Sequence, residues 1–304
     1  MILTRWLAVL LIVGASMGAR AQNLPQFDGN RALTYTREFV AIGPRWVGSP
    51  GHAKAEAFIR AQFRRDHLEE DTFTAKTSIG PETFHNFIVK FPGKKDGIIV
   101  LASHYETNYW LRNIHFVGAN DGGSTTGLLI EIANELRGKP NDGYSVWLVF
   151  DDGEESFQSQ WNDNDALYGT RHLAEKWQAD GTLKHIRAFL LADMLGDKEL
   201  DIQRDQNSTP WLEDLVYKAA SQYGWQSYFF RITTAVDDDH IPFVKRGVPC
   251  ADIIDLDYGY ENAYHHTAED TMDKLSAHSL MVAGDTFLET IRLLDQRIRP
   301  AGRR

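Results

Sequence analysis

Side chains that could bind a metal ion and move a proton are concentrated in five short segments of this sequence. The segments are 103–106, 118–123, 151–155, 192–194 and 264–267, which contain His104, Asp121, Glu154, Glu155, Asp193 and His266. Carboxylate and imidazole groups are common zinc ligands, and a catalytic zinc keeps one position open for water or substrate. In a pair such as Glu154 and Glu155, one acid can bind the metal while its neighbour carries a proton. Together the segments indicate a metal-dependent enzyme, although each one alone would more often be a helix cap or a solvated loop.

Most of these segments directly follow predicted strands. Apolar or alternating runs that are typical of strands occur at 84–91, 97–103, 144–150 and 186–191. Helical spacing of apolar residues occurs at 32–42, 51–68, 127–136 and 168–178. This alternation predicts an α/β fold with a mostly parallel central sheet that is flanked by helices on both faces. Ligands bind such sheets beyond the carboxyl ends of the strands, so we expect the acidic and histidine side chains to meet at one edge.

The first residues have the layout of a secretory signal peptide. Arg5 precedes an apolar run at 6–13, and small residues then lead to Ala19-Arg20-Ala21, a cleavage motif of the A-x-A type. We therefore expect a signal peptide at 1–21, a single catalytic domain at 22–304, and export to a periplasm or to the outside of the cell. A retained membrane anchor is the less favoured alternative, because the apolar run is shorter than the roughly 20 residues that span a bilayer.

Charge and cysteine content narrow the class of protein further. The chain has 42 acidic and 32 basic residues, a formal net charge of −10, and loss of two arginines with residues 1–21 would bring it to −12. Such a charge disfavours nucleic acid as a partner. Cys250 is the only cysteine, so no internal disulfide can form. Its apolar surroundings predict a buried, inert thiol.

The order of the motifs resembles that of a known enzyme superfamily. The motifs are H-x-E from His104, N-D-G-G-S-x-x-G from Asn120, D-G-E-E from Asp152, Asp193 at a strand end, and H-T-x-x-D from His266. This order is similar to the zinc-dependent exopeptidases, which include bacterial aminopeptidases, and the resemblance runs from about Pro44 to the final helix. Two longer stretches, 154–174 and 238–249, look like glutaminyl-peptide cyclotransferases, which convert N-terminal glutamine to pyroglutamate.

The resemblance implies roles for individual residues. It implies one zinc ion that is bound by Asp121, Glu155 and His266, with Glu154 as the general acid and base. Peptide or protein N-termini would be the substrates. It further implies two hydrogen-bonding acids near the substrate, Asp193 and Asp238. Around these acids it implies Trp161 as an aromatic wall, His240 in a network with Asp238, and His265.

The sequence also departs from the family pattern. Glu106 occupies a position that is usually Asp, and His265 stands where the animal enzymes place a tryptophan. Ala102 and Ser103 exclude the disulfide that the animal enzymes carry near the first strand.

Two other functions stay open at this point. In a two-zinc aminopeptidase, His104 and Asp193 would hold a second ion and Asp121 would bridge the pair. In a non-catalytic binding domain of the same fold, we would expect some of the metal ligands to be lost, whereas all are present here.

Overall fold

The structure, a computed structural model, describes residues 24–297. The predicted signal peptide at 1–21 lies outside these residues, so the structure does not test it. No helix within the described part has both the length and the hydropathy needed to cross a membrane.

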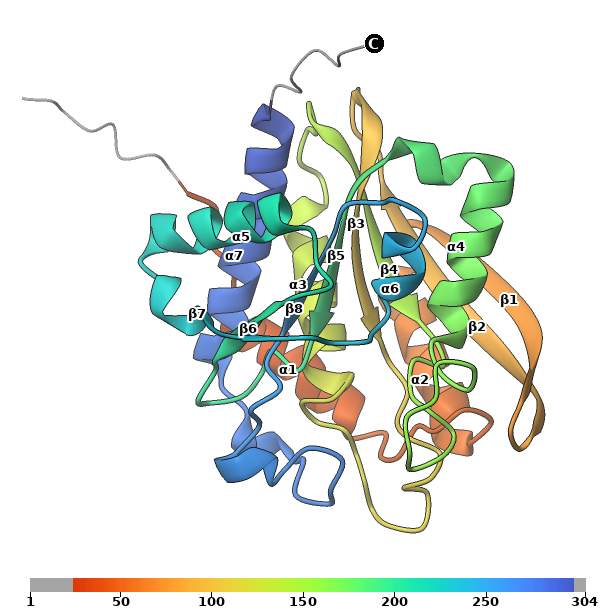
Figure 1. Cartoon of the computed structure of the whole chain (residues 1–304). Coiled ribbons are helices and arrows are strands. Elements are labelled where there is room, and N and C mark those ends of the chain that lie inside the picture. Colours follow the sequence, from red (N-terminus) through yellow and green to blue (C-terminus); the bar gives the residue numbers. More distant parts are fainter. Residues whose placement is uncertain (1–23, 298–304) are drawn as a thin grey trace, which may run out of the picture.

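A six-stranded sheet lies at the centre of the molecule (Figure 1). In spatial order its strands are β1 (His67–Thr77), β2 (Gly80–Phe91), β4 (Tyr144–Asp151), β3 (Lys95–His104), β5 (Ile186–Asp193) and β8 (Cys250–Ile254). The last four of these strands are parallel, and β1 and β2 are antiparallel. The predicted mostly parallel sheet is therefore confirmed.

Helices cover both faces of the sheet (Figure 1). One face packs against α1 (Gly29–Val40), α2 (Pro50–Phe63), α3 (Gly123–Leu136), α5 (Pro210–Tyr223) and α7 (Ala277–Gln296). The other face packs against α4 (Tyr168–Asp180) and α6 (Ile241–Val244), which contribute Leu173, Trp177 and Phe243 to a second apolar cluster. Short 3-10 helices occur at Thr182–His185, Gln226–Tyr228, Tyr260–Asn262 and Met272–Lys274.

One predicted helix is too long at its C-terminal end. The apolar spacing predicted a helix over 51–68, but α2 ends at Phe63 and residues 67–77 form the edge strand β1. Only two residues of β1, Asp71 and Thr77, are buried. Because an edge strand with so little buried surface does not need apolar residues at every second position, its sequence carries no period-two signal.

A second, two-stranded sheet is formed by β6 (Ile202–Asp205) and β7 (Phe229–Thr234). Three hydrogen bonds connect the segment after β6 to β8. The backbone nitrogen of Thr209 donates to the carbonyl of Cys250 at 2.7 Å, that of Cys250 donates to Thr209 Oγ1 at 3.1 Å, and that of Asp252 donates to Ser208 Oγ at 2.9 Å. The small sheet is thus held against the edge of the large one.

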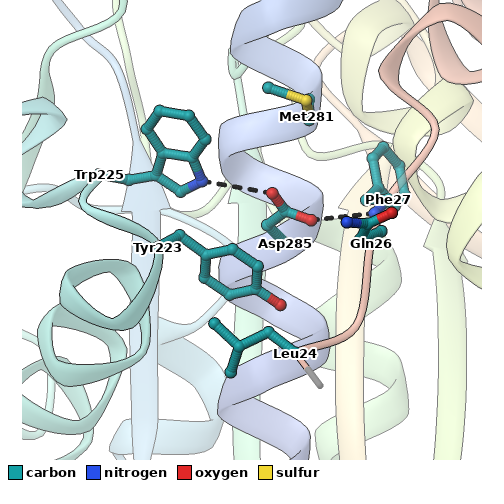
Figure 2. Close-up of a pocket in the computed structure, with 7 residues that line it drawn as sticks. All are labelled: Leu24, Gln26, Phe27, Tyr223, Trp225, Met281 and Asp285. Carbon is teal, nitrogen blue, oxygen red and sulfur yellow. Dashed lines mark hydrogen bonds between the residues drawn. The ribbon is translucent and has the colours of Figure 1, made fainter. Parts of the chain in front are cut away.

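The segment that precedes α1 is fixed on α7. Figure 2 shows Asp285 of α7, whose carboxylate accepts hydrogen bonds from the backbone nitrogen of Phe27 at 2.9 Å and from the indole of Trp225 at 3.3 Å. The hydroxyl of Tyr223 also donates to the carbonyl of Pro25. The pocket drawn in Figure 2 is therefore lined by a carboxylate that already has hydrogen-bond donors on both oxygens, which indicates a structural joint.

Candidate active site

The carboxyl ends of the parallel strands form one edge of the sheet, as predicted. His104 is the last residue of β3 and pairs in register with Asp151, the last residue of β4. Asp193 ends β5 and pairs with Ile254, the last residue of β8. The loops that follow these strands therefore start from one common edge, and they carry the predicted ligands Asp121, Glu155 and His266 together with Glu154.

Asp121 reaches this edge through a turn that requires glycine. Gly122, the N-cap of α3, has a φ of +69°, which is in the left-handed region. A Cβ atom at this position would lie only 2.9 Å from Cε1 of His104. Both the backbone conformation and the close approach of the imidazole explain why glycine follows the proposed ligand.

The three predicted zinc ligands meet around one imidazole nitrogen. His266 Nε2 lies 3.2 Å from Asp121 Oδ2 and 3.3 Å from Glu155 Oε1. Both of those carboxylate oxygens are buried, and neither has a hydrogen-bond partner among the described residues. Buried polar atoms are rarely left unpaired, and oxygen and imidazole donors suit zinc. The donor set therefore fits a divalent cation.

Surrounding residues fix the position of these ligands. Asp270, the last residue of the H-T-x-x-D motif, accepts hydrogen bonds from the backbone nitrogens of Asn120 at 2.8 Å and Asp121 at 3.2 Å. The ring of His266 packs edge-on against Trp110 and Phe116, with centroid distances of 5.8 and 6.2 Å. The motif thus contains one predicted ligand, its histidine, and its aspartate orients another, Asp121.

A small cavity of about 150 Å³ opens beside these ligands. Its walls include every predicted site residue except His104 and His240, namely Asp121, Glu154, Glu155, Trp161, Asp193, Asp238, His265 and His266. Trp161 is 39% exposed, and its indole donates to Asp163 at 2.9 Å. The indole therefore lies at the rim of the cavity, and the acids form its floor.

Two of the acids in the cavity have pKa values well above the ordinary range. Burial raises the pKa of Glu154 well above its ordinary value, and the neighbouring carboxylates of Glu155 and Asp238 raise it further. Burial likewise raises the pKa of Asp238, with added repulsion from Asp193 and Asp239. Crowded carboxyl groups of this kind are typical of sites that transfer protons.

The surroundings of His265 favour the neutral form of its imidazole. Burial lowers its pKa, and the neighbouring His266 lowers it further. The side-chain amide of Asn262 lies 3.1 Å from its Nδ1. The other nitrogen, Nε2, is thus able to donate a hydrogen bond, which a tryptophan ring nitrogen at this position could also do.

His104 lies between two acids at the edge of the sheet. Its Nε2 is 3.1 Å from Asp121 Oδ1 and 3.3 Å from Asp193 Oδ1. Donor atoms of these three residues lie within 4.8 Å of one another, which is the arrangement that a second metal ion would need. The donors for the two-zinc alternative are therefore also brought together.

The predicted partner of His240 is wrong. The contacts of its buried ring are with Asp205, at 3.1 Å, and Asp252, at 3.8 Å, and not with Asp238. Residues 238–240 form a tight turn that leads into α6. Asp238 lines the cavity, whereas His240 is not among the residues that line it. The closeness of Asp238 and His240 in the sequence suggested that they share a network, but the turn separates their side chains.

Two residues of the site have no signal in the sequence. Asn108 is 1% exposed, donates from Nδ2 to Glu155, and lies 3.3 Å from His266 Nε2. Arg45 is fully buried, and its guanidinium donates to the backbone carbonyls of Tyr105, Val117 and Gly118. An isolated asparagine or arginine in a loop has no pattern that separates it from the solvated residues around it.

Arg45 fixes the loop that carries Asp121, and its replacement should destabilise the protein. Because Arg45→Met would leave three backbone carbonyls without donors, we expect the free energy of unfolding to fall by about 3 kcal/mol. Urea unfolding followed by circular dichroism would measure the change. The exposed Arg65→Met is the matched control and should alter stability by no more than about 0.5 kcal/mol. Equal stability of the two variants would exclude this role for Arg45.

Comparison with known proteins shows which proteins this chain is similar to. Residues 86–291 match peptidase family M28. The glutaminyl-peptide cyclotransferase of Drosophila melanogaster is 30% identical over 256 residues, which cover 75% of this chain and 70% of that protein. A crystal structure of a glutaminyl cyclase from an Acidobacteriales bacterium is 61% identical, with a TM-score of 0.88 over 91% of this chain and 98% of that one. The glutaminyl cyclase of Porphyromonas gingivalis is 28% identical, with a TM-score of 0.79 over 90% of this chain and 99% of that one.

Proposed function

The chain belongs to peptidase family M28 and, within it, to the glutaminyl cyclases, and we propose that it acts on the N-termini of exported peptides with one zinc ion in its active site. The reaction converts N-terminal glutamine to pyroglutamate and releases ammonia. The observation that supports the zinc site best is His266 Nε2, which lies within 3.3 Å of unpartnered carboxylate oxygens of both Asp121 and Glu155.

Asp121, Glu155 and His266 would hold the ion, which when bound would polarise the side-chain carbonyl of the substrate glutamine. Glu154 borders the same cavity and is placed to take a proton from the attacking α-amine. The new bond joins the α-nitrogen to the side-chain carbonyl carbon, and the bond from this carbon to the amide nitrogen breaks. Glu154 returns its proton to that departing nitrogen, which leaves as ammonia.

Asp193 and Asp238 complete the polar wall of the cavity. Because the pKa of Asp238 is raised, its carboxyl group is able to donate a hydrogen bond to an oxygen of the substrate. Trp161 lies at the rim of the cavity, and His265, which also lines it, offers an N–H. Ring closure is intramolecular, so holding the glutamine in a folded conformation supplies a large part of the rate.

A two-zinc aminopeptidase is the second candidate, and the grouping of His104, Asp121 and Asp193 is the observation that favours it. A non-catalytic binding domain is disfavoured, because all predicted ligands and proton-carrying acids are present and lie together.

A pair of peptides distinguishes these functions. The purified protein is incubated with Gln-Ala-Ala and, separately, with Leu-Ala-Ala, and ammonia and free amino acids are measured. A glutaminyl cyclase releases ammonia from the first peptide and leaves the second intact. Free leucine from the second peptide, without ammonia from the first, would contradict the proposal and support the aminopeptidase.

A further inference from the structure

A second group of buried metal-binding side chains lies outside the active-site cavity. It consists of Asp205 at the end of β6, His240 at the start of α6 and Asp252 within β8. Each of these residues is at most 1% exposed, and one donor atom from each lies within 4.8 Å of the others. The group has the same donor chemistry as the proposed catalytic ligands, two carboxylates and one imidazole.

Most donor atoms of this group have no hydrogen-bond partner. His240 Nε2 lies 3.1 Å from Asp205 Oδ2, and His240 Nδ1 lies 3.8 Å from Asp252 Oδ2. Neither contact has the alignment of a hydrogen bond, and both ring nitrogens and both oxygens of Asp252 are unpartnered within residues 24–297. The proposed catalytic ligands show the same feature, since Asp121 Oδ2 and Glu155 Oε1 are unpartnered too.

Hydrogen bonds from neighbouring residues fix the orientation of the Asp205 carboxylate, as they do for many metal ligands. Its Oδ1 accepts from the backbone nitrogens of Asn207 and Val236, both at 3.0 Å, and its Oδ2 accepts from the hydroxyl of Ser208 at 2.7 Å. Oδ2 is also the oxygen that faces His240. These hydrogen bonds fix the direction of the carboxylate, as outer contacts do for metal ligands, and Oδ2 keeps a second lone pair for a cation.

Asp252 is costly to bury as it stands. It is fully buried, and neither of its carboxylate oxygens has a hydrogen-bond partner within residues 24–297. An unpaired carboxylate in such a place is strongly destabilising, whereas a bound divalent cation would neutralise two carboxylates at once.

We propose that Asp205, His240 and Asp252 bind a second zinc-class divalent cation, separate from the catalytic ion. Two carboxylates and an imidazole supply three ligands, and water would complete the coordination. The ion would have a structural role, because it joins the small sheet through β6 and the start of α6 to β8 of the central sheet. Since Asp238 lies two residues before His240, the ion would also fix the turn that carries this acid into the cavity.

Metal content and anomalous diffraction test this site without reference to activity. The full chain is purified after growth with zinc, its zinc is measured by mass spectrometry, and crystals are measured above and below the zinc absorption edge. We expect two zinc ions per chain and an anomalous peak between Asp205, His240 and Asp252. A wild-type map with no peak between these residues would overturn the proposal, even if no variant can be purified.

Variants assign each ion to its ligands. Asp252→Asn should reduce the zinc content from two ions to one and keep the peak at the active site, whereas Glu155→Gln should do the reverse. Asp142→Asn, which changes an exposed aspartate of the same size, should retain two. An Asp252→Asn protein that keeps the wild-type zinc content and both peaks would contradict the proposal. A second peak between His104 and Asp193 would instead support the aminopeptidase, so the positions of the peaks separate the two ideas.

Discussion

Replacement of Glu154 by glutamine should lower kcat for a Gln-initiated peptide by about 10²- to 10⁴-fold, which is the usual contribution of a general acid and base. Glutamine has nearly the same shape as glutamate but cannot take a proton from the amine or return it to the leaving nitrogen. The side chain borders the cavity and is not one of the three proposed ligands, so the zinc of the active site should stay bound. Ammonia release under saturating substrate would measure the loss.

Two further measurements make the result specific to Glu154. Zinc content and the thermal unfolding curve of Glu154→Gln should equal those of the wild type, and the exposed Glu175→Gln should keep full activity. An unchanged kcat in Glu154→Gln would show that another group carries the proton. A loss of zinc would show instead that Glu154 belongs to the ligand set.

Replacement of His266 by glutamine should abolish both zinc binding at the active site and turnover. His266 contacts both carboxylate ligands, so its loss removes the group at which the three ligands meet. Because a bound metal supplies several kcal/mol of transition-state stabilisation, we expect kcat/KM to fall by about 10³-fold or more. Activity and zinc content would be measured on the same samples.

Chelation provides the matching test on the unmodified protein. A chelator should inactivate the wild type, and added zinc should restore it, whereas the same zinc concentration should not restore His266→Gln. The exposed His67→Gln should behave as the wild type in both steps. A His266→Gln enzyme that is fully active after chelation would rule out a catalytic metal at this position.

The sequence predicted the edge of the sheet well because two strong signals coincide there. Buried parallel strands need continuous apolar runs, and the polar residues that follow such runs stand out clearly. His104, Asp151 and Asp193 are the last residues of β3, β4 and β5, and the predicted strands end one or two residues before them. The ligand set depended on the family resemblance, because spacing alone did not separate Glu155 from Glu154 as the metal ligand.

Other parts of the site could not be read from the sequence. His240 points away from Asp238 because the chain turns tightly between them, and turns of this kind leave no periodic signal. Asn108 and Arg45 act through the tertiary structure. Asn108 contacts Glu155, and Arg45 donates to carbonyls that lie 60 and 72 residues away along the chain. Such contacts depend on how distant loops pack, which local patterns do not encode.

A labelled substrate tests the central claim, cyclisation by attack of the α-amine on the side-chain carbonyl, most directly. The substrate is Gln-Ala-Ala with ¹⁵N only in the side-chain amide of glutamine, and mass spectrometry follows both products. The proposed reaction predicts that all the label leaves as ammonia while the peptide loses the mass of one ammonia and nothing else. Release of free labelled glutamine, or a peptide that has gained water in place of the amide, would contradict it.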